Sequence, residues 1–376
     1  MSVSLKNFVD ININYHETTT LSGSRETIVL LGNSGVQFKY LAPDGRTIVS
    51  LNDATITSPD VYQENDEALT KYIKYFFSNG GKIIHYINVE KGKEIEKLKT
   101  LPMEEIVVVL FNMVLNDAIT LVKTINQDSF FTGIYEKMFV AYSNTLDDIT
   151  NETILNNVKN IENLVIKYIG DSVDPGFEMS VAAYLSKINV YYGTINDYNF
   201  TIEKVNEDDE ADSLIDDNSI VEKILANNFN ADIILTGDSV NIGGNTTSGK
   251  DLVNHFYKIM LTQTLTQKLC NTLKSKLRYN QTGLNIISNT IVDELNRYRT
   301  NGYLSTNKVW EEEDWIENQT TIIKKDTLLS LGYKFVIMPF SSLTDEEKKK
   351  HQLPKIYLLI ADSYAIRLIN IVGEVY

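Results

Sequence analysis

The fold is decided by three short segments in the middle of the chain: IVVVLF (Ile106–Phe111), LNDAITLVKTI (Leu115–Ile125) and MFVAY (Met138–Tyr142). The first and third are continuous apolar runs, short enough for strands and typical of strands that are buried on both faces. The second spaces its apolar residues three and four positions apart, which predicts an amphipathic helix. Together the segments predict a strand–helix–strand unit with two parallel strands.

The same alternation continues on both sides of this unit. Further strands are predicted at Ile28–Leu31, Ile83–Val89, Leu164–Ile169, Lys334–Met338 and Ile356–Ile360. Further helices are predicted at Asp66–Asn79, Glu152–Asn163, Phe177–Ile188, Leu252–Leu277 and Gly283–Arg299, and Asn189–Val205 is strand-like and rich in tyrosine. The sequence therefore predicts an α/β (α+β) fold in which a mixed sheet is flanked by helices.

Composition excludes several functional classes. The chain has 376 residues, with 35 Lys and Arg against 50 Asp and Glu, and its formal net charge is −15. An acidic protein is a poor match for nucleic acid, because phosphate binding needs a basic face. No stretch approaches eighteen apolar residues, so no membrane span is predicted, and no secretory signal is visible at the N-terminus. The single cysteine, Cys270, excludes a disulfide framework.

Both ends of the chain read as extended β segments. Near the N-terminus, apolar and polar residues alternate, which predicts a strand with one covered face. Its apolar face consists of Val3, Leu5, Val9, Ile11, Ile13 and Tyr15. The last segment, Tyr364–Tyr376, is also strand-like, with apolar residues Ile366, Leu368, Ile369, Ile371, Val372 and Val375. A lone strand cannot satisfy its own backbone groups, so each must pair with an edge of the same fold or with another chain.

Two acidic runs are predicted to be solvated loops. Asn206–Asp217 contains seven acids and no base, a pattern that repels itself. It lacks the glycine and glutamate that an EF-hand requires at its sixth and twelfth positions, so no calcium site is predicted. The second run, Glu311–Asp314, lies between Trp310 and Trp315.

The best candidate for a chemical motif is GNTTSGKD, which contains Gly244, Gly249 and Lys250. It fits the phosphate-binding P-loop pattern except at its last position, where Asp251 replaces the serine or threonine that would bind Mg²⁺. The residues Gly237–Gly243 also separate this loop from the preceding apolar strand. The alternative is an ordinary polar loop that leads into a helix, with Asp251 at the positive end of the helix dipole.

No other catalytic or metal-binding pattern is found. The four histidines, His16, His85, His255 and His351, lack the spacing of a metal site and are predicted to be surface or packing residues. Cys270 lies in an apolar helical stretch, which predicts a buried, inert thiol. The sequence therefore predicts no enzyme, no metal and no cofactor.

Four segments, in this order along the chain, together resemble contractile phage tail sheath proteins in their compact form. They are FFSNGGKIIHYINV (Phe76–Val89), ILANNFNADIIL (Ile224–Leu235), SKLRYNQTGLNIISNTIVDELNRYRTNGYLSTNKVW (Ser275–Trp310) and LPKIYLLIADSYAIRLINIVGEVY (Leu353–Tyr376). The likeness covers about two thirds of the chain, and residues 90–205 match only loosely.

This resemblance implies a structural role without catalysis. Sheath subunits stack as hexameric rings or a six-start helix around a tail tube, and terminal arms reach into neighbouring subunits to complete a shared sheet by β-augmentation. The implied partners are other copies of the chain, the tail tube protein, and baseplate and neck or terminator proteins. The implied location is the virion tail, assembled in the host cytoplasm. Contraction would then drive the tube through the host envelope.

The resemblance also divides the chain into regions. Residues 1–18 are expected to form an N-terminal β arm, 19–205 an α/β region, and 206–250 the acidic and Gly/Asn/Thr loop region. Residues 251–352 would form the helical C-terminal part of the sheath domain, and 353–376 the C-terminal strands and arm. Two alternatives remain: a P-loop-like nucleotide-binding enzyme that uses Lys250, and an acidic tail-associated adaptor that stays monomeric.

Overall fold

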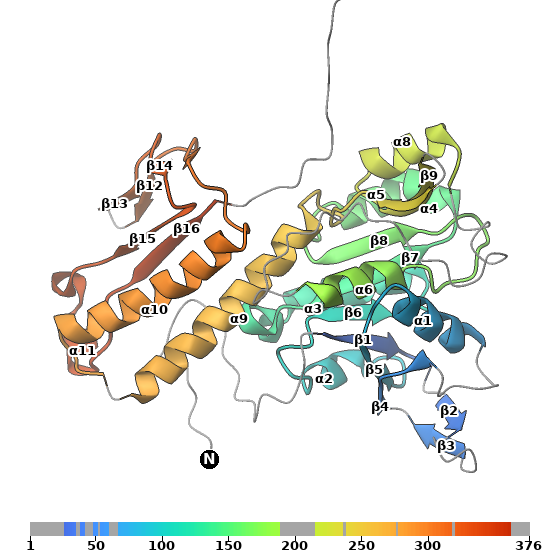
Figure 1. Cartoon of the computed structure of the whole chain (residues 1–376), viewed down its shortest axis with the longest axis horizontal. Helices are drawn as coiled ribbons and strands as arrows, with labels where there is room; N and C mark the ends of the chain where they lie inside the picture. Colours follow the sequence, from blue (N-terminus) through green and yellow to red (C-terminus); the bar gives the residue numbers. More distant parts are fainter. Residues whose placement is uncertain are drawn as a thin grey trace, which may run out of the picture. The chain divides into compact units, whose positions relative to one another are not determined.

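The computed structural model of the chain describes residues 26–34, 38–41, 48–51, 53–59, 67–188, 215–235, 238–275, 277–317 and 320–361 (Figure 1). The described residues fall into two compact units. Those up to Ile259 form what we call the sheet unit, and those from Met260 onward form the hairpin unit. The predicted strand-like segment Asn189–Val205 and most of the acidic run Asn206–Asp217 lie outside the described residues.

The sheet unit is built on a six-stranded sheet in the order β4-β5-β1-β6-β7-β8. Its strands are β1 (Thr27–Gly32), β4 (Asp53–Ile56), β5 (Ile83–Asn88), β6 (Val107–Leu110), β7 (Met138–Ser143) and β8 (Leu164–Tyr168). All neighbouring pairs are parallel except β4 and β5, which are antiparallel. This confirms the predicted mixed α/β sheet. Two antiparallel hairpins accompany it: β2 (Phe38–Leu41) with β3 (Ile48–Leu51), and β9 (Ala231–Leu235) with β10 (Asp238–Ile242).

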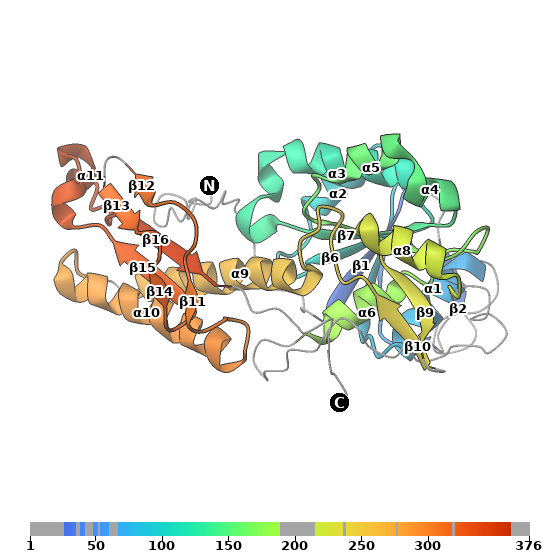
Figure 2. The same cartoon turned by 90° about the horizontal axis from the view of Figure 1, so that it is seen from above.

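Helices cover both faces of this sheet, as a parallel sheet requires. Figure 2 shows α2 (Glu94–Leu98), α3 (Leu115–Gln127), α4 (Leu146–Thr150) and α5 (Glu152–Val158) on one side. The helices α1 (Glu67–Ser78) and α6 (Met179–Lys187) lie on the other side, and α8 (Asn218–Ala226) precedes β9. Strands β1, β6, β7 and β8 are buried along their whole length, which explains why their sequences are mostly apolar.

The predicted helices and strands that lie in the described residues are confirmed, with one boundary that is clearly different. The helix predicted over Glu152–Asn163 ends at Val158. The Val158 carbonyl accepts the Ile161 amide at 2.8 Å, a bond across three residues instead of four, and the Thr247 hydroxyl of a distant loop lies 2.9 Å from both the Val158 and the Ile161 carbonyl oxygens, between which it shares its proton. Sequence periodicity cannot reveal such a long-range contact.

The hairpin unit contains the second half of α9 (Leu252–Lys274), the helix α10 (Gln281–Thr300) and several short antiparallel hairpins. These hairpins are β11 (Lys308–Val309) with β14 (Leu328–Leu329), β12 (Trp315–Glu317) with β13 (Thr320–Ile323), and β15 (Tyr333–Ile337) with β16 (Ile356–Ile360). The charged segment after β15 contains a short helix, α11 (Asp345–Lys349). A capping box between Thr344 and Glu347 starts it.

Buried charge ties α9 to α10 within the hairpin unit. The Glu294 side chain on α10 is fully buried and pairs with both Lys268 of α9 and Arg297 of its own helix. The α9–α10 turn is set by Gly283, because a Cβ at this position would lie 2.0 Å from the carbonyl oxygen of Arg278. Asn280 caps α10 by accepting a hydrogen bond from the Gly283 amide at 3.1 Å. The glycine at position 283 is therefore explained by local packing.

One buried ion pair joins the edge of the central sheet to the segment that follows α8. Lys167, in the middle of β8, and Asp232, in β9, are both almost completely buried and in direct contact. Lys167 also donates to the Phe177 carbonyl at 2.9 Å and to the Ser180 hydroxyl at 2.6 Å. The Asp232 carboxylate accepts a second hydrogen bond, from Asn241 at 2.7 Å. Both charges are thus compensated inside the protein.

Replacing Lys167 by methionine should destabilise the sheet unit strongly. The substitution leaves the Asp232 carboxylate buried without its positively charged partner, which typically costs about 3–5 kcal/mol. Urea unfolding of the variant measures this loss. The matched control is Lys159→Met, because Lys159 is an exposed lysine of the same unit. The double variant Lys167→Met/Asp232→Leu should regain part of the stability, and equal losses in the single variant and the control would contradict this account.

Candidate functional site

The predicted subunit-interaction residues lie outside the described residues. This holds for the whole N-terminal set, from Val3 to Tyr15, and for the whole C-terminal set, from Ile366 to Val375. Their pairing by β-augmentation therefore stays a prediction. The P-loop-like segment, by contrast, is described in full.

The glycines of this loop serve the packing of the loop itself. The backbone amides of Gly244 and Asn245 donate to the side-chain oxygen of the fully buried Asn230, at 2.7 and 3.3 Å. Gly243 has a φ of 103°, and a Cβ there would lie 2.6 Å from the Phe229 carbonyl oxygen. In a P-loop these amides would surround a phosphate. Here the two amides bind the Asn230 side chain in place of a phosphate.

The rest of the loop is also engaged internally. The amides of Thr246, Thr247 and Gly249 donate to the carbonyls of Lys250, Leu164 and Thr246, respectively. The Lys250 ammonium pairs with Glu162 at 2.7 Å, and Asp251 accepts a hydrogen bond from the Asn254 amide at 2.9 Å, as a cap of α9. The loop follows the antiparallel β9–β10 hairpin, whereas a P-loop follows a strand of a parallel sheet. This geometry favours the ordinary loop over a phosphate site.

The sheet order indicates a second position where a ligand could bind. The parallel strands follow the doubly wound order, with β5 added on one side of β1 and β6, β7 and β8 on the other. In such sheets, ligands bind outside the carboxyl ends of the strands, at the point from which successive strands are added in opposite directions. In this sheet, that point lies between β1 and β6. Gly32 at the end of β1 and Phe111 just after β6 border this position.

The protein's own side chains fill this crevice. The Phe111 ring is only 7% exposed and packs edge-on against Tyr72 at 4.9 Å and Tyr86 at 6.3 Å between ring centroids. A Cβ on Gly32 would meet Phe111 at 3.1 Å. Beside it, the Asn88 side chain accepts a hydrogen bond from the Ser34 amide at 3.1 Å. The position that holds ligands in other doubly wound sheets is thus occupied by aromatic packing.

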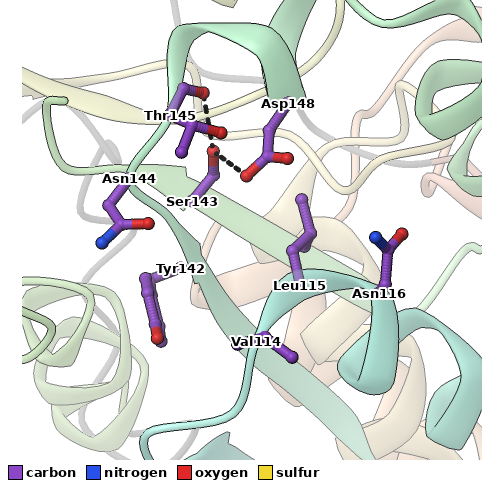
Figure 3. Close-up of a pocket in the computed structure, with 8 residues that line it drawn as sticks. All are labelled: Val114, Leu115, Asn116, Tyr142, Ser143, Asn144, Thr145 and Asp148. Atoms are coloured by element: carbon purple, nitrogen blue, oxygen red, sulfur yellow. Dashed lines mark hydrogen bonds between the residues drawn. The ribbon is translucent and has the colours of Figure 1, made fainter. Parts of the chain in front are cut away.

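A small pocket of about 190 Å³ opens beside the crevice, at the carboxyl ends of β6 and β7 (Figure 3). It is lined by Val114, Leu115, Asn116, Tyr142, Ser143, Asn144, Thr145 and Asp148. Ser143 donates a hydrogen bond to the Asp148 carboxylate at 3.0 Å, as Figure 3 shows. No histidine or lysine lines the pocket, so the serine lacks the base that would activate it as a nucleophile.

Two histidines contact carboxylates. His85, on β5, contacts Asp53 of β4 at 2.8 Å through Nε2 and Glu105 at 2.9 Å through Nδ1. His255, on α9, contacts Glu136 at 3.0 Å. His351 is exposed, and His16 lies outside the described residues. Within the described ranges, no three metal-ligating side chains are grouped so that they could hold an ion.

The His85 cluster spans the edge of the sheet. Burial opposes a charged imidazole, but hydrogen bonds and charge from Glu105 and Asp53 outweigh it, so the pKa of His85 is raised. Asp53 also pairs with Lys97 of α2 at 2.6 Å. Sequence reasoning missed this cluster, because its three acidic and basic partners lie 12–32 residues from His85 and follow no motif. The pairing of β4 with β5 brings Asp53 to His85, and α2 and the segment before β6 supply Lys97 and Glu105.

Comparison with known proteins does not name a family: no family model matches the chain, and no curated protein is detectably similar to it. Among the helices that the structure describes, none is both long and apolar enough to cross a membrane.

The stability that His85 contributes should decrease as the pH rises. Its folded-state pKa is raised above the usual value of about 6.5, so the contribution is complete below that pH and is lost as the pH rises through the folded-state pKa. Urea unfolding of the wild type and of His85→Gln between pH 5.5 and about 9 measures the difference. We expect the two stabilities to converge toward alkaline pH, and a constant difference would contradict the assignment.

The loop geometry also predicts that the protein does not bind nucleotides. Calorimetric titration of the wild type with ATP and Mg²⁺ should show no saturable heat, because the loop amides and Lys250 already have partners. Saturable binding that disappears in Lys250→Ala but persists in Lys258→Ala, an exposed lysine of α9, would contradict this expectation.

Proposed function

We propose that the protein is a structural subunit of a contractile tail sheath, which polymerises around a tail tube and contracts to drive the tube through the host envelope. Neighbouring subunits are linked when segments 3–15 and 364–376 add strands to a neighbour's sheet. The partners are other copies of the chain, the tube protein, and baseplate and neck or terminator proteins. The subunit works in the virion tail.

The observation that carries this proposal is the β15–β16 hairpin. Its strands pair over five residues each, from Tyr333↔Ile360 to Ile337↔Ile356, and it has no third strand among the described residues. All five side chains of β16 are half-buried. A two-stranded sheet of this kind has two edges with backbone groups that an incoming strand can bind.

The energetics suit such a linkage. Each apolar side chain of an added strand that becomes fully buried contributes roughly 1.5–3 kcal/mol. The alternating pattern of segment 3–15 supplies one apolar face and thereby a register, because a slip by one residue would expose that face. A strand attached in this way can stay bound while the bodies of the subunits rearrange.

The segments that carry the resemblance have structural explanations in this fold. Gly80 ends α1 with a φ of 81°, and a Cβ on Gly81 would lie 2.3 Å from the Phe76 ring. Gly283, in the first turn of α10, is required by the close approach of the Arg278 carbonyl. These residues shape turns, and none of them lines the pocket beside β6 and β7. The filled crevice at β1 and β6 is likewise expected of a protein without a substrate.

Deleting Met1–Tyr15 or Tyr364–Tyr376 should abolish ordered assembly. We expect the full-length protein to form hollow tubes or rings by negative-stain electron microscopy, and either deletion to leave only unassembled subunits, because the shared sheet is lost.

A finer comparison separates the faces of the N-terminal segment. The variant Leu5→Ser/Val9→Ser/Ile11→Ser removes the apolar face and should prevent assembly. The matched control Lys6→Ser/Asp10→Ser/Asn12→Ser alters the polar face and should assemble. Tubes of normal length from either deletion would refute the proposal.

A further inference from the structure

The outer edge of β16 can be assigned residue by residue. The Met338 amide donates to the Lys355 carbonyl at 3.0 Å, and the Ala361 amide donates to the Gly332 carbonyl at 2.8 Å. Hydrogen-bonded and non-bonded pairs alternate along an antiparallel ladder, so every second residue from Lys355 to Ala361 bonds to the β15 side. The residues between them direct their backbone groups to the outer edge of β16; these are Ile356, Leu358 and Ile360.

This outer edge has no partner in the part of the chain that the structure describes. There, β16 pairs with β15 alone, and no backbone hydrogen bond reaches the three edge residues from the other side. All three carry apolar side chains and no charge. An uncharged, open edge is a template for any strand that can pair with it, and soluble proteins normally cover or blunt such an edge. The unassembled subunit therefore needs a cover for β16.

The two faces of the hairpin contact different elements. The Tyr333 hydroxyl donates to the Asn296 side chain of α10 at 3.2 Å, and Tyr333 is the direct cross-strand partner of Ile360. Because direct partners and every second residue share a face, all three edge residues lie on the face toward α10. On the opposite face, Tyr357 packs edge-on against Trp315 at 5.6 Å between ring centroids. A strand added at the outer edge would extend the α10 face if its own apolar residues fall on that side.

The chain itself continues from the end of this strand. The described residues end at Ala361, one position after β16, and residues 362–376 follow. Asp362 and Ser363 are of the types that favour turns, and hairpin loops of up to five residues are common. A return along the five residues of β16 therefore needs only part of this segment.

The sequence after the turn residues fits the edge in one register. With a five-residue loop, 361–365, Ile366 lies opposite Ile360 and Leu368 lies opposite Leu358. Both apolar residues then fall on the α10 face, while Arg367 falls on the opposite face. A slip by one residue would place the arginine on the α10 face, so the pattern favours this register.

We propose that, in the unassembled subunit, residues 366–370 fold back as a third strand on the outer edge of their own β16, and that they exchange this edge for a neighbour's when subunits assemble. The same backbone bonds form within one copy or between two, so the exchange is a domain swap. In dilute protein the short loop gives the segment a high effective concentration at its own edge, and the internal contact prevails. The exchange with a neighbour rests on the proposed function, whereas the internal contact does not.

Hydrogen exchange at residue resolution tests the internal contact in the full-length chain, diluted until sedimentation velocity shows monomers. We expect the edge amides of Ile356, Leu358 and Ile360 to exchange at least about tenfold more slowly in the wild type than after deletion of Tyr364–Tyr376, because strand pairing protects them. The amides of Tyr357 and Leu359, which lie on the β15 side, should stay protected in both proteins and show that the hairpin is intact.

A pair of substitution variants tests the register. Ile366→Ser/Leu368→Ser removes the two apolar residues of the added strand, so its edge amides should exchange as fast as those of the deletion. The matched control, Arg367→Ser/Glu374→Ser, changes a residue of the opposite face and one beyond the strand, and it should exchange like the wild type.

The outcomes separate this contact from the sheath proposal. Protected edge amides in monomers support the internal contact whether or not tubes form at high protein concentration. Equal exchange in the wild type and the deletion, protection that is lost on further dilution, or protein that stays assembled on dilution would each overturn it. Unprotected edge amides in a monomer that still forms tubes when concentrated would overturn it and leave the sheath proposal intact.

Discussion

The sheet unit depends on the buried ion pair between Lys167 and Asp232. The pair lies where β8, the last strand of the central sheet, meets the segment that follows α8, and it also holds the start of α6 through the Phe177 carbonyl and Ser180. Two residues before Asp232, the buried Asn230 binds β8 and both amides at the start of the glycine loop. One short segment thus completes the sheet edge and determines the conformation of the loop that most resembles a nucleotide site.

This arrangement changes the meaning of the glycine-rich loop. Glycines, a lysine and small polar residues are what a phosphate site needs, but they are equally what a tight loop needs when it closes on an asparagine side chain. The rings of Phe111, Tyr72 and Tyr86 also argue against a ligand site. They fill the crevice between β1 and β6 in which a doubly wound sheet would hold a ligand. The two-stranded β15–β16 hairpin, whose edges can accept further strands, is the feature on which our proposal of an assembling subunit rests.

Most of the secondary structure was predictable from local pattern. The buried strands are continuous apolar runs and the helices have clear periodicity, so the α/β class follows from residues such as Ile106–Phe111 and Leu115–Ile125. The shorter elements were not predictable. The end of α5 contacts Thr247, 89 residues from Val158, and the cap of α11 consists of reciprocal hydrogen bonds between the side chains and backbone amides of Thr344 and Glu347. The His85 cluster likewise needs the β4–β5 register, which no motif encodes.

The sequence by itself determined the fold class, the acidic character, the lack of a recognisable catalytic pattern and the alternation of residues 3–15, because all of these depend on composition or on spacing along the chain. The tertiary structure decided which strands are neighbours, where buried charges find their partners and how the loop amides are used. These features join residues that are far apart in the chain, and only the packed fold determines which distant residues meet.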